Sequence, residues 1–373
     1  MDTRCLHITG NQSLQLLRAA REGQIVSAGA TDRHDVAPFP KAFATLEDLK
    51  ANDLLEWLNV SAESPLEVLV PSAGERRCLT GMHMRTLSVD VPPTSFLELR
   101  EGSDSSNSIH LPNDLRIFIE APSLALARAA VALMGGTDGA SGKDDLDAML
   151  RLIALANEFC GRYARDPLKP STGKAYYDKP TVDGRFTNPE ELQRALRQLR
   201  NVDGVARARL AAKYAIDESG SPMETYLNMG LTLPPRLAGF SMEQPLANKQ
   251  LRYASPNGVS LRHKSLRPDL QWPSIRFLIE YLGDKEHASK GARVEDKNRL
   301  QDYAATDYKA VFLMYDDIRS VQALNKTALM VAREFAKHGK TFEPHRVKRL
   351  MRDDEFHQRQ MTLVAKLLPP VSY

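Results

Sequence analysis

The run from Ile275 to Tyr281 constrains the fold of this chain more than any other segment. Its residues are mostly apolar and it is bounded by Pro273 and Gly283, which predicts a buried β-strand. Glu280 lies near its end, and burying a carboxylate is costly unless the group has a partner or a metal ion. A second acid, Asp269, lies at the start of the preceding hairpin arm. The sequence therefore predicts two carboxylates that the hairpin brings together.

With 373 residues, the chain is long enough for two or three domains with a sizeable core. Its composition, 42% hydrophobic and 26% charged residues, is typical of a soluble globular protein. No apolar run approaches the ~20 residues of a membrane span, and the N-terminus carries no secretory signal. The three cysteines (Cys5, Cys78, Cys160) are far apart, which fits neither a disulfide framework nor a CxxC metal site. We expect a cytoplasmic protein with no membrane association.

Periodicity and composition predict an α/β fold in four parts. Residues 1–135 mix short β-type runs with helices, and residues 143–218 form a helical connector. Residues 219–320 show the order helix, hairpin, strand, helix, strand, in which an Asn-Gly turn closes the hairpin at 250–263. Residues 321–373 form a basic helical C-terminal extension.

The net charge of +3 is too small to indicate a nucleic-acid partner, but the charge is unevenly distributed. Between Arg319 and Arg352 there are nine Lys or Arg residues and only two acids, Glu334 and Glu343. Such a segment could follow a phosphate backbone. Alternatively, these cations are the solvated faces of surface helices.

A series of motifs runs in order through residues 200–320. They are Gly204-Val-Ala-Arg207, Ser221-Pro-Met-Glu224, Arg267-Pro-Asp269, Trp272-Pro273, Ile279-Glu280-Tyr281, Glu295-Asp296 and Arg299. In this combination the segment resembles the very-short-patch-repair-like endonuclease domains of the PD-(D/E)XK nuclease superfamily. The resemblance covers about a third of the chain. It implies a restriction-endonuclease-like fold that hydrolyses phosphodiester bonds of DNA.

The resemblance also implies a role for each acid. It makes Asp269 and Glu280 ligands of Mg²⁺ or Mn²⁺, with the carbonyl of Tyr281 as a further ligand, and it makes Glu224 an acid that helps to hold metal or water. Hard oxygen ligands select these cations over zinc. The departure from the family is Leu282, where the superfamily usually has Lys and this branch usually has an acid. A leucine can neither coordinate a metal nor orient a water.

Each of these acids also has a simpler explanation. Asp269 is suited to a turn at a strand entry. Glu224 stands three residues after Ser221, the spacing of a helix capping box. Glu280 could form a salt bridge, with Arg267 or Lys264 as the partner.

Two polar residues follow the predicted strand and are further site candidates. Asp284 could supply the polar group missing at position 282, and His287 could act as a general acid or base. A lone loop histidine is more often a surface group. On the next helix, Arg299 is spaced for ion pairs with Glu295 and Asp296.

Residues 66–130 resemble the body of abortive-infection antitoxins of the AbiE type. The matching pieces are Val68-Leu-Val-Pro71, Gly81-Met-His83 and Ile117-Phe-Ile-Glu-Ala-Pro122. This resemblance implies a region that contacts DNA or a protein partner.

The chain has no P-loop, GxGxxG, GxSxG or HExxH motif, so kinase, dehydrogenase, esterase and zincin functions lack support. The first hypothesis is a metal-dependent DNA endonuclease, weakened or inactivated by Leu282. The alternative is a non-catalytic DNA-binding or regulatory protein of an antitoxin-like defence system that uses a nuclease fold.

Overall fold

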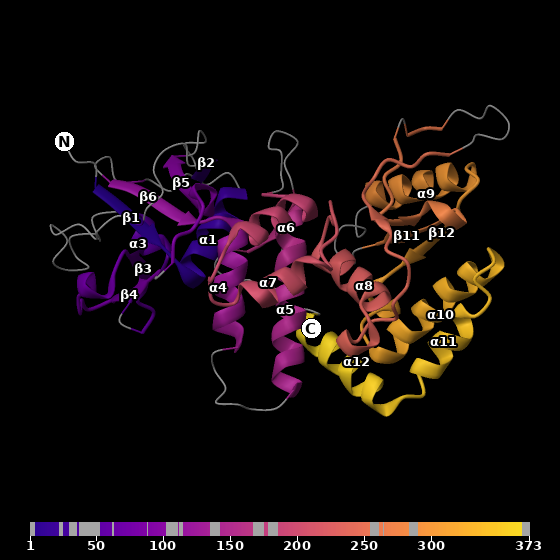
Figure 1. Ribbon diagram of the computed structural model, residues 1–373. Helices are drawn as coiled ribbons and strands as arrows, with labels where there is room; N and C mark the ends of the chain where they lie inside the picture. The colour runs from indigo at the N-terminus through magenta and orange to yellow at the C-terminus, as the bar shows by residue number, and fades with distance from the viewer. Residues whose placement is uncertain are drawn as a thin grey trace. The chain divides into compact units, whose positions relative to one another are not determined.

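The computed structural model has a mixed α/β fold, as predicted, and divides into two compact units (Figure 1). The first unit comprises Met1–Ser141 and Tyr163–Lys213, and the second comprises Gly142–Arg162 and Tyr214–Tyr373. The predicted connector 143–218 is therefore shared between the two units. The structure describes residues 4–21, 25–29, 36, 53–61, 63–87, 89–101, 111, 115–134, 142–166, 175–177, 186–253, 261–263, 265–282 and 290–367.

A six-stranded mixed sheet forms the centre of the first unit, in the order β2-β5-β6-β1-β3-β4. β1 is parallel to β6 and β3 is parallel to β4, while the remaining pairs are antiparallel. The apolar residues of the central strands, such as Leu6, Ile8, Ile117 and Ile119, are almost fully buried. The strands are β1 (Arg4–Ile8), β2 (Ile25–Gly29), β3 (Leu66–Val70), β4 (Met82–Thr86), β5 (Phe96–Glu101) and β6 (Leu115–Glu120).

Helices cover this sheet because the chain turns directly from strand into helix at two places. α1 (Gly10–Arg21) follows β1, α4 (Pro122–Met134) follows β6, and the two helices pack together. α6 and α7 pack on α4. The remaining elements of this unit are α3 (Asp53–Trp57), β7 (Tyr163–Arg165), β8 (Ala175–Tyr177), α6 (Pro189–Gln198) and α7 (Val205–Ala212).

The second unit is built around a four-stranded sheet in the order β12-β11-β10-β9. β9, β10 and β11 are antiparallel neighbours, and β12 runs parallel to β11. Helix α5 packs on α8 and α12, and α10 packs on α11. The elements are α5 (Gly142–Cys160), α8 (Pro222–Thr232), β9 (Leu246–Ala247), β10 (Leu270–Trp272), β11 (Phe277–Tyr281), α9 (Lys290–Ala304), β12 (Lys309–Leu313), α10 (Val321–Lys337), α11 (Glu343–Leu350) and α12 (Asp354–Leu367).

The predicted buried strand is present, but it begins at Phe277 and not at Ile275. Pro273 to Ile275 form a 3₁₀ turn, and Arg276 adopts φ +48, which reverses the chain between β10 and β11. Trp272 lies against Phe277 of the neighbouring strand and against Phe335 of α10, so one face of the hairpin faces α10. On the opposite face, Leu278 is in the same apolar cluster as Tyr303 of α9.

The hairpin predicted at 250–263 is not formed as such in the described residues. No strand is assigned at 250–253 or 261–263, and residues 254–260, which include the Asn-Gly turn, lie outside the described residues. The backbone N–H of Leu251 donates instead to the carbonyl of Leu266, at 2.7 Å. Among the described residues, no helix is long and apolar enough to cross a membrane.

Candidate active site: the carboxylates of the second unit

The register of the β10–β11 hairpin brings Asp269 and Glu280 together. Leu270 is paired with Ile279, and continuing this antiparallel register by one residue sets Asp269 opposite Glu280. Directly opposed residues of antiparallel strands point to the same face of the sheet. The carboxylate of Asp269 also accepts a hydrogen bond from the N–H of Tyr281, at 2.6 Å, which fixes it against the end of β11. The two acids therefore lie side by side, as the sequence predicts.

Glu280 is buried, with 3% of its surface exposed, and α9 supplies its partners. The guanidinium of Arg299 lies 2.8 Å from Oε1 of Glu280, and the hydroxyl of Tyr303 donates to the same oxygen. Because Arg299 and Tyr303 are four residues apart on a helix, both reach the strand from one face of α9. The salt bridge that explains Glu280 without a metal is thus present, and its partner in the described residues is Arg299. Lys264, one of the two predicted partners, lies outside the described residues.

The pKa values of both α9 side chains respond to this acid. Burial lowers the pKa of Arg299, but the charges of Glu280, Tyr303 and Asp269 outweigh burial and raise it. Burial, followed by the charge of Glu280, raises the pKa of Tyr303 above the usual range of a phenol. Arg299 therefore stays charged and Tyr303 stays a hydrogen-bond donor at neutral pH. The charge of Asp269 makes a smaller contribution in the same direction to the pKa of Arg299.

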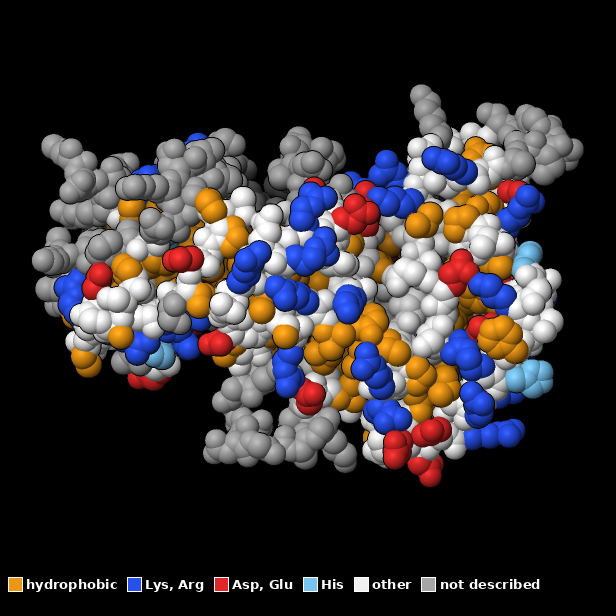
Figure 2. All heavy atoms as spheres, in the orientation of Figure 1, with side chains coloured by type: hydrophobic (Ala, Val, Ile, Leu, Met, Phe, Trp, Pro, Cys, Tyr) orange, Lys and Arg blue, Asp and Glu red, His pale blue; other side chains and the backbone are white. Residues whose placement is uncertain are grey.

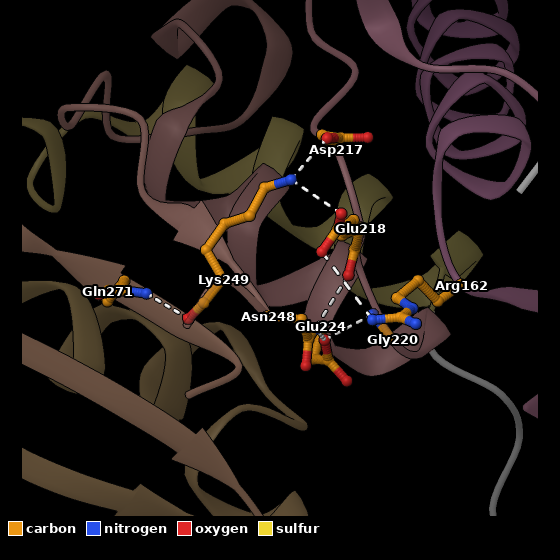
Figure 3. Close-up of polar contacts among 8 residues, drawn as sticks. All are labelled: Arg162, Asp217, Glu218, Gly220, Glu224, Asn248, Lys249 and Gln271. Atoms are coloured by element: carbon orange, nitrogen blue, oxygen red, sulfur yellow. Dashed lines mark hydrogen bonds and ion pairs between the residues drawn. The ribbon is translucent and has the colours of Figure 1, made fainter. Parts of the chain in front are cut away.

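Glu224 is the third acid, in the first turn of α8 (Figure 3). Its Oε2 accepts hydrogen bonds from the N–H of Gly220 and from Nδ2 of Asn248, each at 2.7 Å. The hydroxyl of Ser221 caps the N–H of Glu224, at 3.1 Å, so one half of the predicted capping box is formed. The returning bond from the glutamate side chain goes to Gly220, one residue before the cap.

The pKa of Glu224 is raised well above the usual range of a glutamate. Burial is the main cause, and the negative charge of Asp269 is the second. A carboxyl group that loses water and faces another acid takes up a proton more readily. The negative charge of Asp269 therefore acts on Glu224, so α8 and the β10–β11 hairpin interact electrostatically.

Ion pairs around the start of α8 hold this arrangement in place (Figure 3). Nζ of Lys249 lies 2.8 Å from carboxylate oxygens of Asp217 and of Glu218. Arg162 lies 3.9 Å from Glu218, whose carbonyl accepts a bond of 3.0 Å from Asn248. These contacts tie the segment before α8 to the segment after β9.

The link continues into the sheet. The side-chain amide of Gln271, in β10, donates to the carbonyl of Lys249, at 2.6 Å. The N–H of Asn248 donates to the carbonyls of Pro268 and Asp269, at 3.0 and 3.3 Å. The residues around Glu224 are therefore bonded directly to the strand that begins after Asp269.

The remaining candidates follow β11. Leu282 is half-buried, and its N–H donates to the carbonyl of Leu313, at 2.7 Å, so it continues the pairing of β11 with β12. Side chains alternate along a strand, so Leu282 lies on the face of Glu280 and puts an apolar group beside the acids. Tyr281, whose carbonyl is the expected further ligand, is half-buried at the end of β11. Asp284 and His287 lie outside the described residues.

These residues fit a divalent cation in part. Their oxygens are the hard donors that Mg²⁺ and Mn²⁺ prefer, and the repulsion between Asp269 and Glu224 is what a cation would relieve. However, no group of three or more His, Cys, Asp or Glu side chains in the described part of the chain is arranged to hold a metal ion. The guanidinium of Arg299 occupies Oε1 of Glu280, so a metal could use that oxygen only after Arg299 moves.

Sequence reasoning did not identify the groups that neutralise these acids. Arg299 was expected to pair with Glu295 or Asp296 within its own helix, but it pairs with Glu280 of β11. Tyr303 and Asn248 carried no motif that marked them. The one available signal for Tyr303 is its i,i+4 spacing from Arg299.

Comparisons with known proteins give no family. No protein-family model, no curated protein and no solved structure matches the chain. The function of the site is therefore inferred from its own residues: the two carboxylates that the hairpin register opposes, a third acid whose pKa one of them raises, and a guanidinium paired with Glu280.

Proposed function

We propose that this protein is a metal-dependent DNA endonuclease whose second unit has a PD-(D/E)XK-type fold. The observation that carries the proposal is the β10–β11 register, which sets Asp269 opposite Glu280 when it is continued by one residue, together with the hydrogen bond from the N–H of Tyr281 to Asp269. Nothing in the packing of an ordinary hairpin requires two acids at facing positions, since like charges there are destabilising. The coupling of Glu224 to Asp269 supports the proposal by adding a third acid.

In this proposal Asp269 and Glu280 hold Mg²⁺ or Mn²⁺ together with the carbonyl of Tyr281. A bound cation of this kind polarises a phosphoryl oxygen and lowers the pKa of an attacking water. Glu224, whose pKa burial and Asp269 raise, would position that water. Arg299 would have to leave Glu280 for a metal to bind there, and could then neutralise the phosphate. Leu282 supplies no polar group to the nucleophile, which lowers the rate, since lost general-base help costs ~10²–10⁴-fold.

The second candidate is a non-catalytic DNA-binding or regulatory protein of a defence system. Two observations favour it: the apolar Leu282 on the face of Glu280, and the ion pair that satisfies Glu280 without a metal. In this case the carboxylates are structural, and binding to DNA or to a protein partner through the antitoxin-like first unit is the function.

Supercoiled-plasmid nicking with Mg²⁺ and Mn²⁺ tests the proposal. We expect slow nicking by the native protein, no nicking by Glu280→Ala, and faster nicking by Leu282→Asp. Glu98→Ala, a change of the same kind at a partly buried acid of the first unit, is the matched control. Nicking that persists in Glu280→Ala would contradict the proposal. An inert native protein that binds duplex DNA would favour the second candidate.

A further inference from the structure

Helices α10 and α11 carry cations that no acid in the described part of the chain neutralises. Residues 321–352 contain eight Lys or Arg and two acids. Three of the cations are engaged: Lys337 pairs with Glu334, Lys340 with Glu243, and Arg346 with Glu343. The two acids of the segment are both buried.

Five exposed cations remain, and we call them the basic surface. None of them forms an ion pair with an Asp or Glu within the described part of the chain. They are Lys326, Arg333, Lys348, Arg349 and Arg352. Figure 2 shows blue side chains gathered over the part of the molecule where Figure 1 draws α10 and α11.

The cations follow the helical repeat. Lys326 and Arg333 are seven residues apart on α10, so they lie on one face, roughly 10 Å apart along the axis. On α11 and just beyond it, Lys348, Arg349 and Arg352 also share a face, since they are spaced by three and four residues. Unpaired like charges on one helix face are unfavourable. Cations that serve only the fold are expected to pair with nearby acids, as Lys337 does with Glu334 and Arg346 with Glu343.

We infer that the basic surface binds the phosphate backbone of a nucleic acid, outside the carboxylate site. Each strand of B-DNA carries about three phosphates over roughly 10 Å, which matches the reach of the α10 cations. This inference deepens the proposed function by naming the surface that holds the duplex. The inference does not require the protein to be catalytic, because no residue of the basic surface is a candidate metal ligand.

An anionic membrane is the main alternative partner, and the packing of α11 argues against it. A helix that lies in a membrane interface buries its apolar face in lipid. The apolar residue on the inner face of α11, Val347, is fully buried in the protein. Phe342, just before α11, is 61% exposed, but one apolar side chain is far less than an interfacial helix inserts.

Duplex binding measured by fluorescence anisotropy over a salt series tests the inference. The probes are two unrelated duplexes of about 20 base pairs, and the variant is Lys348→Gln/Arg349→Gln/Arg352→Gln. We expect roughly tenfold weaker binding of both duplexes, because phosphate contacts carry no sequence information. The slope of log K against log salt should fall in magnitude by up to about 2.7, or ~0.9 for each lost contact.

The matched control is Arg194→Gln/Arg197→Gln/Arg200→Gln, which removes three exposed cations from the first unit. An equal loss of affinity in this control would mean that net charge alone matters and would overturn the inference, as would an unchanged slope in the α11 variant. Binding to phosphatidylserine vesicles with no duplex binding would also overturn it. Circular dichroism checks that each variant is folded.

The failures of the two proposals are distinguishable. If only catalysis is wrong, Glu280→Ala and the native protein bind the duplex alike and neither nicks it, while the α11 variant binds weakly. If only the basic surface is wrong, the α11 variant binds and nicks like the native protein.

Discussion

At the scale of single residues, Arg299 is the side chain that decides what Glu280 can do. It supplies the positive charge that a buried carboxylate needs, and a metal ion would supply the same. A metal ion bound here would compete with Arg299 for one oxygen, because the guanidinium lies 2.8 Å from Oε1 of Glu280.

Removing Arg299 should therefore cost stability in a way that a metal can restore. Arg299→Met removes the guanidinium that pairs with the buried Glu280, and we expect a loss of roughly 2 kcal/mol, below the 3–5 kcal/mol of a fully buried pair because Arg299 is partly exposed. Mg²⁺ should then raise the melting temperature of Arg299→Met more than that of the native protein.

The double variant Arg299→Met/Glu280→Gln is the control for this prediction. It removes both the guanidinium and the charge of the carboxylate at position 280, so it should recover stability and show no extra response to Mg²⁺. Equal responses of all three proteins to Mg²⁺, measured by differential scanning fluorimetry, would rule out a metal in the place of the guanidinium.

A second residue-scale prediction concerns Glu120, a fully buried acid of the first unit. It accepts bonds from Thr9 and from the N–H of Gly10 at 3.3 Å, and Arg128 lies 3.5 Å away. Burial is the main influence and raises the pKa of Glu120 to about 7, against the lowering effects of Thr9 and Arg128. The folded state thus holds a proton that the unfolded state releases near pH 4.5.

Stability should therefore fall as the pH rises from about 4.5 through 7, by a contribution on the order of 3 kcal/mol. Glu120→Gln cannot ionise, so it should flatten this fall and melt above the native protein at pH 8. Scanning calorimetry at pH 5.5 and 8 measures the difference. Glu98→Gln is the comparison, because the hydrogen bond from Arg116 lowers the pKa of Glu98 and its loss should not flatten the curve.

The residues of the candidate site were predictable to different degrees. The opposition of Asp269 and Glu280 follows from local sequence, because a hairpin joins neighbouring strands and its register decides which side chains face each other. The pairing of Arg299 with Glu280 does not, because it depends on how α9 packs on the sheet. Spacing along α9 points only to partners within the helix, so the sequence does not identify Glu280 as the partner of Arg299.

At the scale of elements, one glycine controls how α7 meets α4. Gly204, just before α7, has φ +79, and a Cβ there would lie 2.2 Å from the carbonyl of Ala127 in α4. Both the backbone conformation and the space require glycine at this position. The start of α7 therefore lies directly against the backbone of α4.

Gly204→Ala should destabilise the first unit by more than about 2 kcal/mol, because a left-handed backbone with a side chain and a steric clash add together. Gly74→Ala is the control, since the nearest atom to its Cβ lies 3.9 Å away and the change should be close to neutral. Melting temperatures of the two variants test the difference. Equal melting temperatures would mean that α7 moves away from α4 freely.

The starts of α6 and β11 differ in how well the sequence predicts them. The capping box at Asn188 and Glu191 is present in full, so α6 starts where its local signals predict. The strand predicted from Ile275 starts two residues later, because Pro273 and the left-handed Arg276 impose a turn that the apolar run conceals. Local chemistry fixes a helix start, whereas a strand start depends on its partner.

At the scale of the whole molecule, the two units are interleaved in sequence. Helix α5 belongs to the second unit, although the chain on both sides of it belongs to the first. The side chain of Asn157, in α5, accepts a bond of 3.0 Å from the N–H of Ile216 and donates to the carbonyl of Ile153 at 2.8 Å. Helices α8 and α12 pack on α5, so the second unit is incomplete without it.

A fragment of residues 214–373 should therefore be unstable alone and be rescued by a peptide of residues 142–162. We expect the fragment to bind a hydrophobic dye and to unfold without cooperativity, and we expect the peptide to restore a cooperative transition. A peptide with Leu150→Asp and Ile153→Asp is the control, because both side chains are fully buried. A fragment that unfolds cooperatively without any peptide would show that α5 is dispensable.

This interleaving sets an order of events on the ribosome. Helix α5 is translated by Cys160, but its partner α12 ends at Leu367, about 200 residues later. At ~5–20 residues per second, the side of α5 that packs on α12 waits roughly 10–40 s for that helix. Throughout that interval this apolar surface of α5 is open to chaperones and proteases, so the helix depends on a segment of the chain that has not yet been made.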